Sequence, residues 1–268
     1  RGAGDRRPPP RPGRVIALSA HLCTLFQELD PLDRPAAARD AGFEVVEAWW
    51  PPAPDPAAWG AAVRAAGLRA VCLNADGGDL AAGERGFCNL PDRADQVVAD
   101  AAAAAELVAA AGGDRVNLLA GRFTADRPEE DQLATAAATV RAAAEAVTPW
   151  GVTIVVEHLN AVDVNRPLLP TPAAAAAFVE RVGHPRVRVL FDAYHAAMAG
   201  LDPLEEAARV APLIGHVQFA DHPGRGAPGT GTLDLWALVD RLDELGYDGA
   251  VGLEFLPDGP TPPLPVRN

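Results

Sequence analysis

Residues 152–192 read VTIVVEHLNAVDVNRPLLPTPAAAAAFVERVGHPRVRVLFD and contain a complete unit of strand, helix and strand. The runs rich in β-branched residues at 152–159 and 186–192 predict two buried strands. Between them, Thr171 and Pro172 are a helix start signal in front of the alanine-rich segment 172–182. This order of elements predicts one βα unit of a parallel sheet.

The same alternation continues in both directions along the chain. The predicted strands are 14–19, 44–49, 68–74, 115–120, 152–159, 186–192, 214–220 and 249–255, and the predicted helices are 34–41, 56–66, 92–111, 129–147, 172–182, 203–210 and 232–245. Eight strands with intervening helices predict a single (β/α)8 TIM barrel over residues 14–256, since such barrels take about 250 residues. A doubly wound open sheet is the alternative, but no GxGxxG motif follows the first strand.

Both ends of the chain differ in composition from this central region. Residues 1–13, RGAGDRRPPPRPG, are rich in Pro, Arg and Gly and have no apolar core of a signal peptide, so we expect a disordered leader. Residues 257–268, PDGPTPPLPVRN, are too rich in Pro to continue a helix or strand. We expect them to form an irregular surface tail.

The composition excludes several classes of function. A net charge of −13 and a sequence pI near 4.8 disfavour a nucleic-acid partner, and no apolar run reaches the length of a membrane span. All basic residues are Arg, so Schiff-base catalysis and a P-loop lysine are excluded. The three cysteines, Cys23, Cys72 and Cys88, form no CxxC pair and favour a reducing, cytoplasmic setting.

Four consecutive predicted strands end on a polar side chain. These are Glu157 in VVEHLN, Asp192 in FDAYH, Gln218 in HVQFAD and Glu254 in GLEF. The intervals between them are 35, 26 and 36 residues, each about one βα unit, so the four side chains are expected to meet at the carboxyl ends of the strands. Three carboxylates at one place repel each other unless they share a cation. Carboxylate and amide oxygens as ligands favour Mg²⁺ or Mn²⁺ over Zn²⁺.

Nearly the whole chain resembles the hydroxypyruvate isomerase family of xylose isomerase-like barrels. The most diagnostic segments are GDLAAGERG at 78–86 and ADHPGRGAPGTG at 220–231. The resemblance implies a divalent-metal site formed by Glu157, Asp192, Gln218 and Glu254, with Glu157 and Glu254 as the acid/base pair. The chain departs from the family at His158, where proline is expected after the catalytic Glu.

This family resemblance implies isomerisation of hydroxypyruvate to tartronate semialdehyde (2-hydroxy-3-oxopropanoate) through an enediolate. One carboxylate removes a proton next to the carbonyl and the other redelivers it. A small anionic hydroxy-keto acid also needs a cationic clamp, for which Arg225 and Arg85 are the candidates. His195 is expected to bind a substrate oxygen. Asn74 and Glu47, at the ends of their strands, are further candidate contacts, and Trp49 and Trp50 are candidates for either a pocket wall or the core.

Several alternatives stay open at this point. A 2-oxo-tetronate isomerase differs from the favoured enzyme only in its substrate, and a ketose 3-epimerase shares the barrel but usually has His where Gln218 stands. An enzyme like endonuclease IV would need a His-rich zinc cluster and a basic face, which six His and a charge of −13 disfavour. A barrel that binds a metabolite without turnover would be expected to lack Glu157 or Glu254. The sequence also leaves open whether the chain forms a homo-oligomer.

Overall fold

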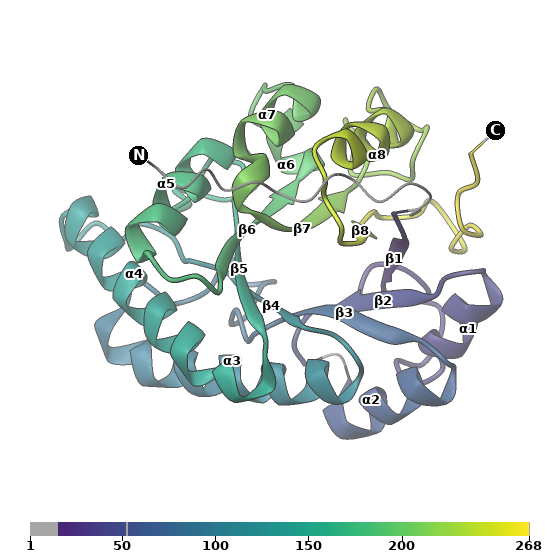
Figure 1. Cartoon of the computed structure of the whole chain (residues 1–268), viewed down its shortest axis with the longest axis horizontal. Helices are drawn as coiled ribbons and strands as arrows, with labels where there is room; N and C mark the ends of the chain where they lie inside the picture. Colours follow the sequence, from purple (N-terminus) through teal and green to yellow (C-terminus); the bar gives the residue numbers. More distant parts are fainter. Residues whose placement is uncertain (1–15, 52, 268) are drawn as a thin grey trace, which may run out of the picture.

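Eight parallel strands close into a barrel in the order β1 to β8, with β1 paired to β8, and helices surround it (Figure 1). The computed structural model describes residues 16–51 and 53–267. The expected leader, 1–13, lies outside these residues. The barrel confirms the predicted (β/α)8 fold. The strands are Leu18–His21 (β1), Val45–Ala48 (β2), Arg69–Asn74 (β3), Arg115–Leu118 (β4), Thr153–Glu157 (β5), Val187–Asp192 (β6), Ile214–Phe219 (β7) and Val251–Leu253 (β8).

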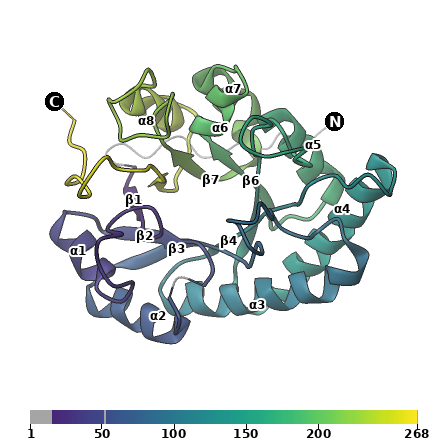
Figure 2. The ribbon, with the colours of Figure 1, turned by 180° about the vertical axis from the view of Figure 1, so that it is seen from behind.

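The helices cover the outside of the barrel, as the views from both sides show (Figure 2). They are Arg34–Asp40 (α1), Pro56–Ala65 (α2), Ala94–Ala110 (α3), Glu129–Ala146 (α4), Pro172–Val182 (α5), Ala193–Met198 (α6), Pro203–Val210 (α7) and Leu235–Glu244 (α8), with 3-10 turns at Pro91–Arg93 (η1), Thr148–Trp150 (η2) and Ala211–Leu213 (η3). Asp55, Thr171, Asp202 and Asp234 each cap a helix through a side-chain oxygen. Such a cap contributes about 1 kcal/mol.

The observed elements differ from the predicted ones at β1 and at α6. The first strand was expected at 14–19, but β1 runs from Leu18 to His21, because Ser19, Ala20 and His21 pair with Val45, Val46 and Glu47. The short helix α6 has no counterpart in the sequence prediction. It begins directly after β6 because the side chain of Asp192 accepts a hydrogen bond from Tyr194 N at 2.7 Å.

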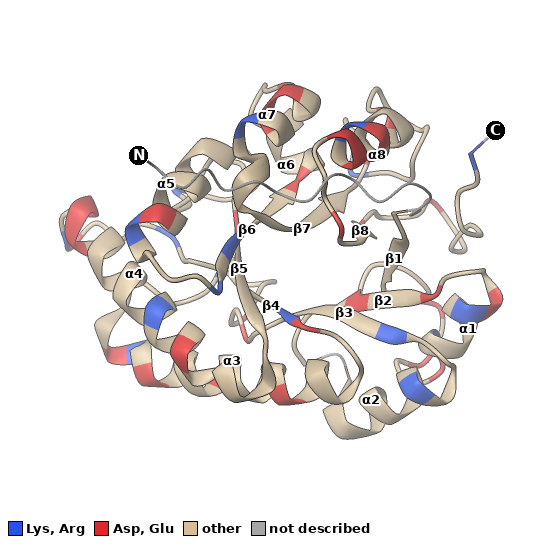
Figure 3. Ribbon diagram, in the orientation of Figure 1, with Lys and Arg blue, Asp and Glu red and all other residues tan. Residues whose placement is uncertain are grey.

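The core lies mainly between the barrel and its helices. Ile154 and Val156 on β5 face the helices and are fully buried, whereas Val155 points to the other face and packs with Leu190 inside the barrel. Burying one such side chain stabilises the fold by about 1.5 to 3 kcal/mol. Asp and Glu lie on the outer helices, including α4, α7 and α8 (Figure 3).

The C-terminal residues 257–267 form no helix or strand. This segment passes beside α1, where Leu264 N donates a hydrogen bond to Ala41 O at 3.0 Å. In residues 16–51 and 53–267, no helix is long and apolar enough to cross a membrane.

Candidate active site

The four polar residues at the ends of β5 to β8 lie at the carboxyl end of the barrel. Asp192 pairs with Gln218 across β6 and β7, and Gln218 pairs with Gly252, two residues before Glu254. Glu157 is the last residue of β5. All four predicted ligands are buried, at 6% exposure or less. Adjacent strands thus bring oxygen-bearing side chains to one end of an apolar barrel.

Glu157, Asp192 and His195 form the tightest group among them. Their ligand atoms all lie within 4.8 Å of one another. His195 Nε2 is 3.6 Å from Glu157 Oε1 and 3.8 Å from Asp192 Oδ2. His195 reaches this place because it lies on the first turn of α6, directly after the strand that ends in Asp192. The two buried carboxylates at these distances can hold a divalent metal, and His195 Nε2 lies beside them.

The loop after β5 determines which nitrogen of His195 faces the carboxylates. Asn160 N donates to His195 Nδ1 at 3.3 Å, so Nδ1 is the acceptor and the proton of the neutral ring is on Nε2. Burial also lowers the pKa of His195 and keeps the ring neutral. The Nε2–H group therefore points toward Glu157 and Asp192 and can donate to a substrate oxygen.

The side chain of Gln218 is held through its amide nitrogen. Its Nε2 donates to Glu47 Oε1 at 2.7 Å, and the other oxygen of Glu47 lies 2.9 Å from His216 Nε2. Since a carboxylate accepts hydrogen bonds, it holds the amide nitrogen of Gln218 and turns Oε1 away. Gln218 Oε1 is buried and has no hydrogen-bond partner among the described residues. This unpaired oxygen and the neighbouring carboxylates fit a hard divalent cation.

Glycine on β8 leaves room for the carboxylate of Glu47. A Cβ at Gly252 would lie 2.2 Å from Glu47 Oε1. Glu47 is 1% exposed and has its contacts inside the barrel. Glu47, one of the further candidate contacts, holds the side chain of Gln218 through the 2.7 Å bond.

Glu254 interacts with different groups from the other three predicted ligands. Trp49 Nε1 donates to Glu254 Oε1 at 2.8 Å, and Arg225 Nη2 donates to Glu254 Oε2 at 2.8 Å. Burial favours the neutral carboxyl, but the charge of Arg225 and nearby His21 more than offset it and lower the pKa of Glu254. Glu254 is thus held ionised, and its carboxylate lies outside the 4.8 Å group formed by Glu157, Asp192 and His195.

Glu157 has the opposite electrostatic environment. Burial, followed by the negative charges of Glu254 and Asp192, raises the pKa of Glu157 well above its ordinary value. Asn117 Nδ2 partly offsets this shift by donating to Glu157 Oε2 at 2.9 Å, and it also lies 3.2 Å from Asn74 Oδ1. The pKa values of these two neighbouring carboxyl groups are therefore shifted in opposite directions, a pattern that separates an acid from a base.

A cavity of about 310 Å³ opens over these groups. Its wall includes six predicted site residues and one of the two tryptophans that were candidates for it: Glu157, Glu254, His195, Arg225, Arg85, Asn74 and Trp49. Two guanidinium groups in a small cavity suit an anionic ligand. Arg85 is held by Leu80 O at 2.8 Å and Glu84 O at 2.6 Å.

The loop that carries Arg225 is organised by Asp221. This buried carboxylate accepts hydrogen bonds from the backbone N–H groups of His222, Gly229, Gly231 and Leu233, at 2.8 to 2.9 Å. Arg225 has a φ of 55°, in the left-handed region. Its carbonyl accepts from Leu256 N at 2.7 Å. These bonds place the guanidinium over the cavity and against Glu254.

Several residues of this site were not predicted from the sequence. Asn117 lies in a predicted strand, and its signal is a polar residue inside an apolar run, as for Gln218. His21 lies 3.6 Å from Glu254 and was missed because the first strand was placed too early. His158, which departs from the family pattern, is buried and accepts a hydrogen bond from Asp192 N at 3.2 Å. Burial lowers the pKa of His158 to about 3, so the ring remains neutral.

Comparison with known proteins gives consistent matches over most of the chain. Residues 35–267 match the family model described as xylose isomerase-like TIM barrel. A putative hydroxypyruvate isomerase of Streptomyces coelicolor is 40% identical over 89% of this chain and 90% of its own. A 2-oxo-tetronate isomerase of Cupriavidus necator is 35% identical over 89% and 92%. A solved structure described as AP endonuclease, family 2, from Brucella melitensis has a TM-score of 0.86 at 30% identity, covering 92% and 95%.

Proposed function

We propose that this chain, which belongs to the xylose isomerase-like TIM barrel family, interconverts hydroxypyruvate and 2-hydroxy-3-oxopropanoate. The named relatives support an isomerase. The observation that carries the proposal is the pair Glu157 and Glu254, which face one cavity and have pKa values shifted in opposite directions.

Proton transfer follows from this difference between the two carboxyl groups. Glu254, held ionised by Arg225, acts as the base that removes a proton from the carbon next to the substrate carbonyl. Glu157, whose pKa is raised by burial, holds a proton that it delivers to the neighbouring carbon of the enediolate. In the reverse direction the two residues exchange roles. Asn117 and Trp49 each donate to one of these carboxyl groups and hold it in place.

The substrate is oriented by cationic and neutral donors. Arg225 and Arg85 line the cavity and are suited to bind the substrate carboxylate. The Nε2–H group of His195 donates to an oxygen of the substrate, since Asn160 fixes that tautomer. The cavity of about 310 Å³ is at the small end of ligand sites, which supports a small acid.

The donor set fits a divalent metal, and we propose Mg²⁺ or Mn²⁺. Glu157, Asp192, Gln218 and Glu254 would hold it, and the unpaired Gln218 Oε1 supports this assignment. When bound, the metal supplies Lewis acidity that polarises the substrate carbonyl. Binding would favour the ionised form of Glu157, which would then take up from solvent the proton that it delivers, and Glu254 would share its carboxylate between the metal and Arg225.

A 2-oxo-tetronate is the alternative substrate, because a relative with that name is 35% identical. Product formation by NMR tests both candidates: enzyme is incubated with each acid, in EDTA and then with added Mn²⁺ or Mg²⁺. We expect a higher kcat/KM for hydroxypyruvate. A higher value for the 2-oxo-tetronate would assign the second substrate, and turnover of neither acid would reject the proposed function.

An endonuclease is not supported by the features of this chain, although one solved relative carries that description. The chain has a net charge of −13, whereas nucleic-acid binding requires a basic surface.

The three cysteines are free, and two of them are buried, which supports a cytoplasmic setting for the enzyme.

A further inference from the structure

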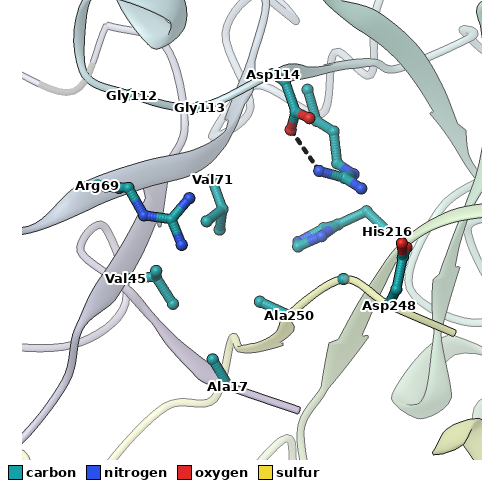
Figure 4. A pocket seen from close by; sticks show the side chains of 12 residues that line it. Ala17, Val45, Arg69, Val71, Gly112, Gly113, Asp114, His216, Asp248 and Ala250 are labelled. Atoms are coloured by element: carbon teal, nitrogen blue, oxygen red, sulfur yellow. Dashed lines mark hydrogen bonds and ion pairs between the residues drawn. The ribbon is translucent and has the colours of Figure 1, made fainter. Parts of the chain in front are cut away.

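The barrel has a cavity at each end. The cavity at the starts of the strands, of about 440 Å³, is lined by charged residues of both signs, Arg69, Arg115, Asp114 and Asp248 (Figure 4). The cavity at the carboxyl ends of the strands is the candidate active site, and its predicted clamp Arg85 lies on the long loop between β3 and η1. The position of Arg85 therefore depends on what holds this loop.

The loop of residues 75–90 passes close to the end of β4. Gly86 has a φ of 83°, and a Cβ there would lie 1.8 Å from Leu119 O, so only glycine fits at this crossing. Two residues later, Cys88 Sγ donates to the same carbonyl at 3.5 Å. Leu119 lines the active-site cavity, as does Arg85. The crossing at Gly86 thus brings Arg85, its neighbour in sequence, to the cavity.

Asn89 joins this loop to the loop after β4. Its side chain is buried, at 1% exposure, and Nδ2 donates to Arg122 O and to Gln132 Oε1, both at 2.9 Å. The backbone carbonyl of Asn89 accepts from Arg127 Nη1 at 2.8 Å. Since an amide nitrogen carries two hydrogens, both side-chain donors of Asn89 are used in this connection.

Gln132, near the start of α4, determines which atom of the Asn89 amide faces it. Gln132 is fully buried, its Oε1 accepts from Thr124 N at 3.0 Å, and its Nε2 donates to Thr124 O at 3.0 Å and to Arg127 O at 2.9 Å. Because backbone N–H groups only donate and carbonyls only accept, Oε1 of Gln132 faces Asn89, which must present its amide nitrogen. A buried polar network whose groups are paired in this way favours one arrangement of the two loops.

We propose that Asn89 is a positioning residue that holds the guanidinium of Arg85 over the active-site cavity. Arg85 Nη1 donates to Leu80 O at 2.8 Å and Glu84 O at 2.6 Å, two carbonyls of its own loop. The guanidinium therefore moves with that loop, and Asn89 ties the loop to α4 and to the loop after β4. This role rests on the proposed function, in which Arg85 binds the carboxylate of the substrate.

Steady-state kinetics of Asn89→Ala with hydroxypyruvate and Mn²⁺ test this role. We expect KM to rise at least about fivefold, because the clamp is misplaced, and kcat to stay within about twofold, because Glu157 and Glu254 are not moved. The control is Val140→Ala, which removes a fully buried side chain from the same helix as Gln132 and should leave KM unchanged. In an Arg85→Gln background, Asn89→Ala should raise KM no further, because Asn89 acts through Arg85.

Urea unfolding shows whether Asn89→Ala is folded. If it is not, Gly86→Ala displaces the same loop from its other contact, because the new Cβ would lie 1.8 Å from Leu119 O, and it should raise KM in the same way. Unchanged KM in the folded loop variant would overturn the proposal. An equal rise in the Arg85→Gln background, or in Val140→Ala, would overturn it as well.

Titration with pyruvate separates this role from the reaction itself. Pyruvate is a 2-oxo acid that lacks the hydroxyl group needed for isomerisation, so calorimetry measures its binding without turnover. We expect Asn89→Ala to weaken pyruvate binding at least about fivefold. Weakened binding of pyruvate with no turnover of hydroxypyruvate by the wild type would reject the proposed function and keep the role of Asn89. Turnover by the wild type, with the same KM and the same pyruvate affinity in Asn89→Ala, would keep the function and reject the role.

Discussion

Replacement of Glu47 by Leu tests how the barrel orients Gln218. The substitution removes the acceptor of the 2.7 Å bond from Gln218 Nε2 and the 2.9 Å contact of His216 Nε2. Each buried polar group left without a partner costs about 1 to 3 kcal/mol, so we expect a loss of about 2 to 6 kcal/mol in the free energy of unfolding. The Gln218 amide also loses its fixed orientation, and outer partners of this kind change metal affinity by about 10- to 100-fold.

The assay is calorimetric titration of Mn²⁺ into metal-free enzyme, with urea unfolding as the measure of stability. Glu47→Gln keeps an acceptor for Gln218 and should retain most of the Mn²⁺ affinity. Leu242→Ala, in the core of α8, should cost about 2 to 5 kcal/mol without changing that affinity. If Glu47→Leu does not fold, Gly252→Ala displaces the same carboxylate, because its Cβ would lie 2.2 Å from Glu47 Oε1. Unchanged Mn²⁺ affinity in these two variants would refute the role of Glu47.

Three further substitutions test the roles of the site residues. Glu254→Gln should lower kcat by at least ~10²-fold with a moderate loss of Mn²⁺ affinity, and a near-normal kcat in steady-state assays would contradict its role as base. Arg225→Ala should raise KM. Because Arg225 lowers the pKa of Glu254, the variant should also move the acid limb of the plot of kcat/KM against pH to higher pH. An unmoved acid limb would count against this contact. In EDTA, the pKa of Glu157 is higher in the folded than in the unfolded protein, so binding of its proton stabilises the fold. This contribution is complete below pH 4.5 and is lost as pH rises toward the raised pKa. Wild type should therefore lose stability relative to Glu157→Gln above pH 4.5. Urea unfolding at several pH values checks this, and a difference independent of pH would contradict it.

The barrel and the ends of its later strands could be predicted because they depend on local patterns. The runs of β-branched residues identified β5 and β6, and the polar residue at the end of each strand identified Glu157 and Asp192 as candidate site residues. Arg225 was identified as a charged residue among glycines in a loop after β7.

Contacts between distant strands could not be read from such patterns. The bond from Gln218 to Glu47 joins residues 171 positions apart, and it decides which atom of the amide is free. His21 was missed because the start of β1 depends on its register with β2. Asn117 resembles any polar residue in a buried strand until the fold brings it to Glu157.

Solvent exchange tests the central claim, Glu/Glu proton transfer next to a carbonyl, most directly. Hydroxypyruvate is incubated in D₂O with enzyme and Mn²⁺ or Mg²⁺, and deuterium is measured by NMR at the carbon next to the carbonyl in substrate and product. We predict that deuterium enters this carbon during turnover, and that Glu254→Gln exchanges at least ~10²-fold more slowly. Isomerisation without any deuterium in the product, or exchange at the normal rate in Glu254→Gln, would contradict the mechanism.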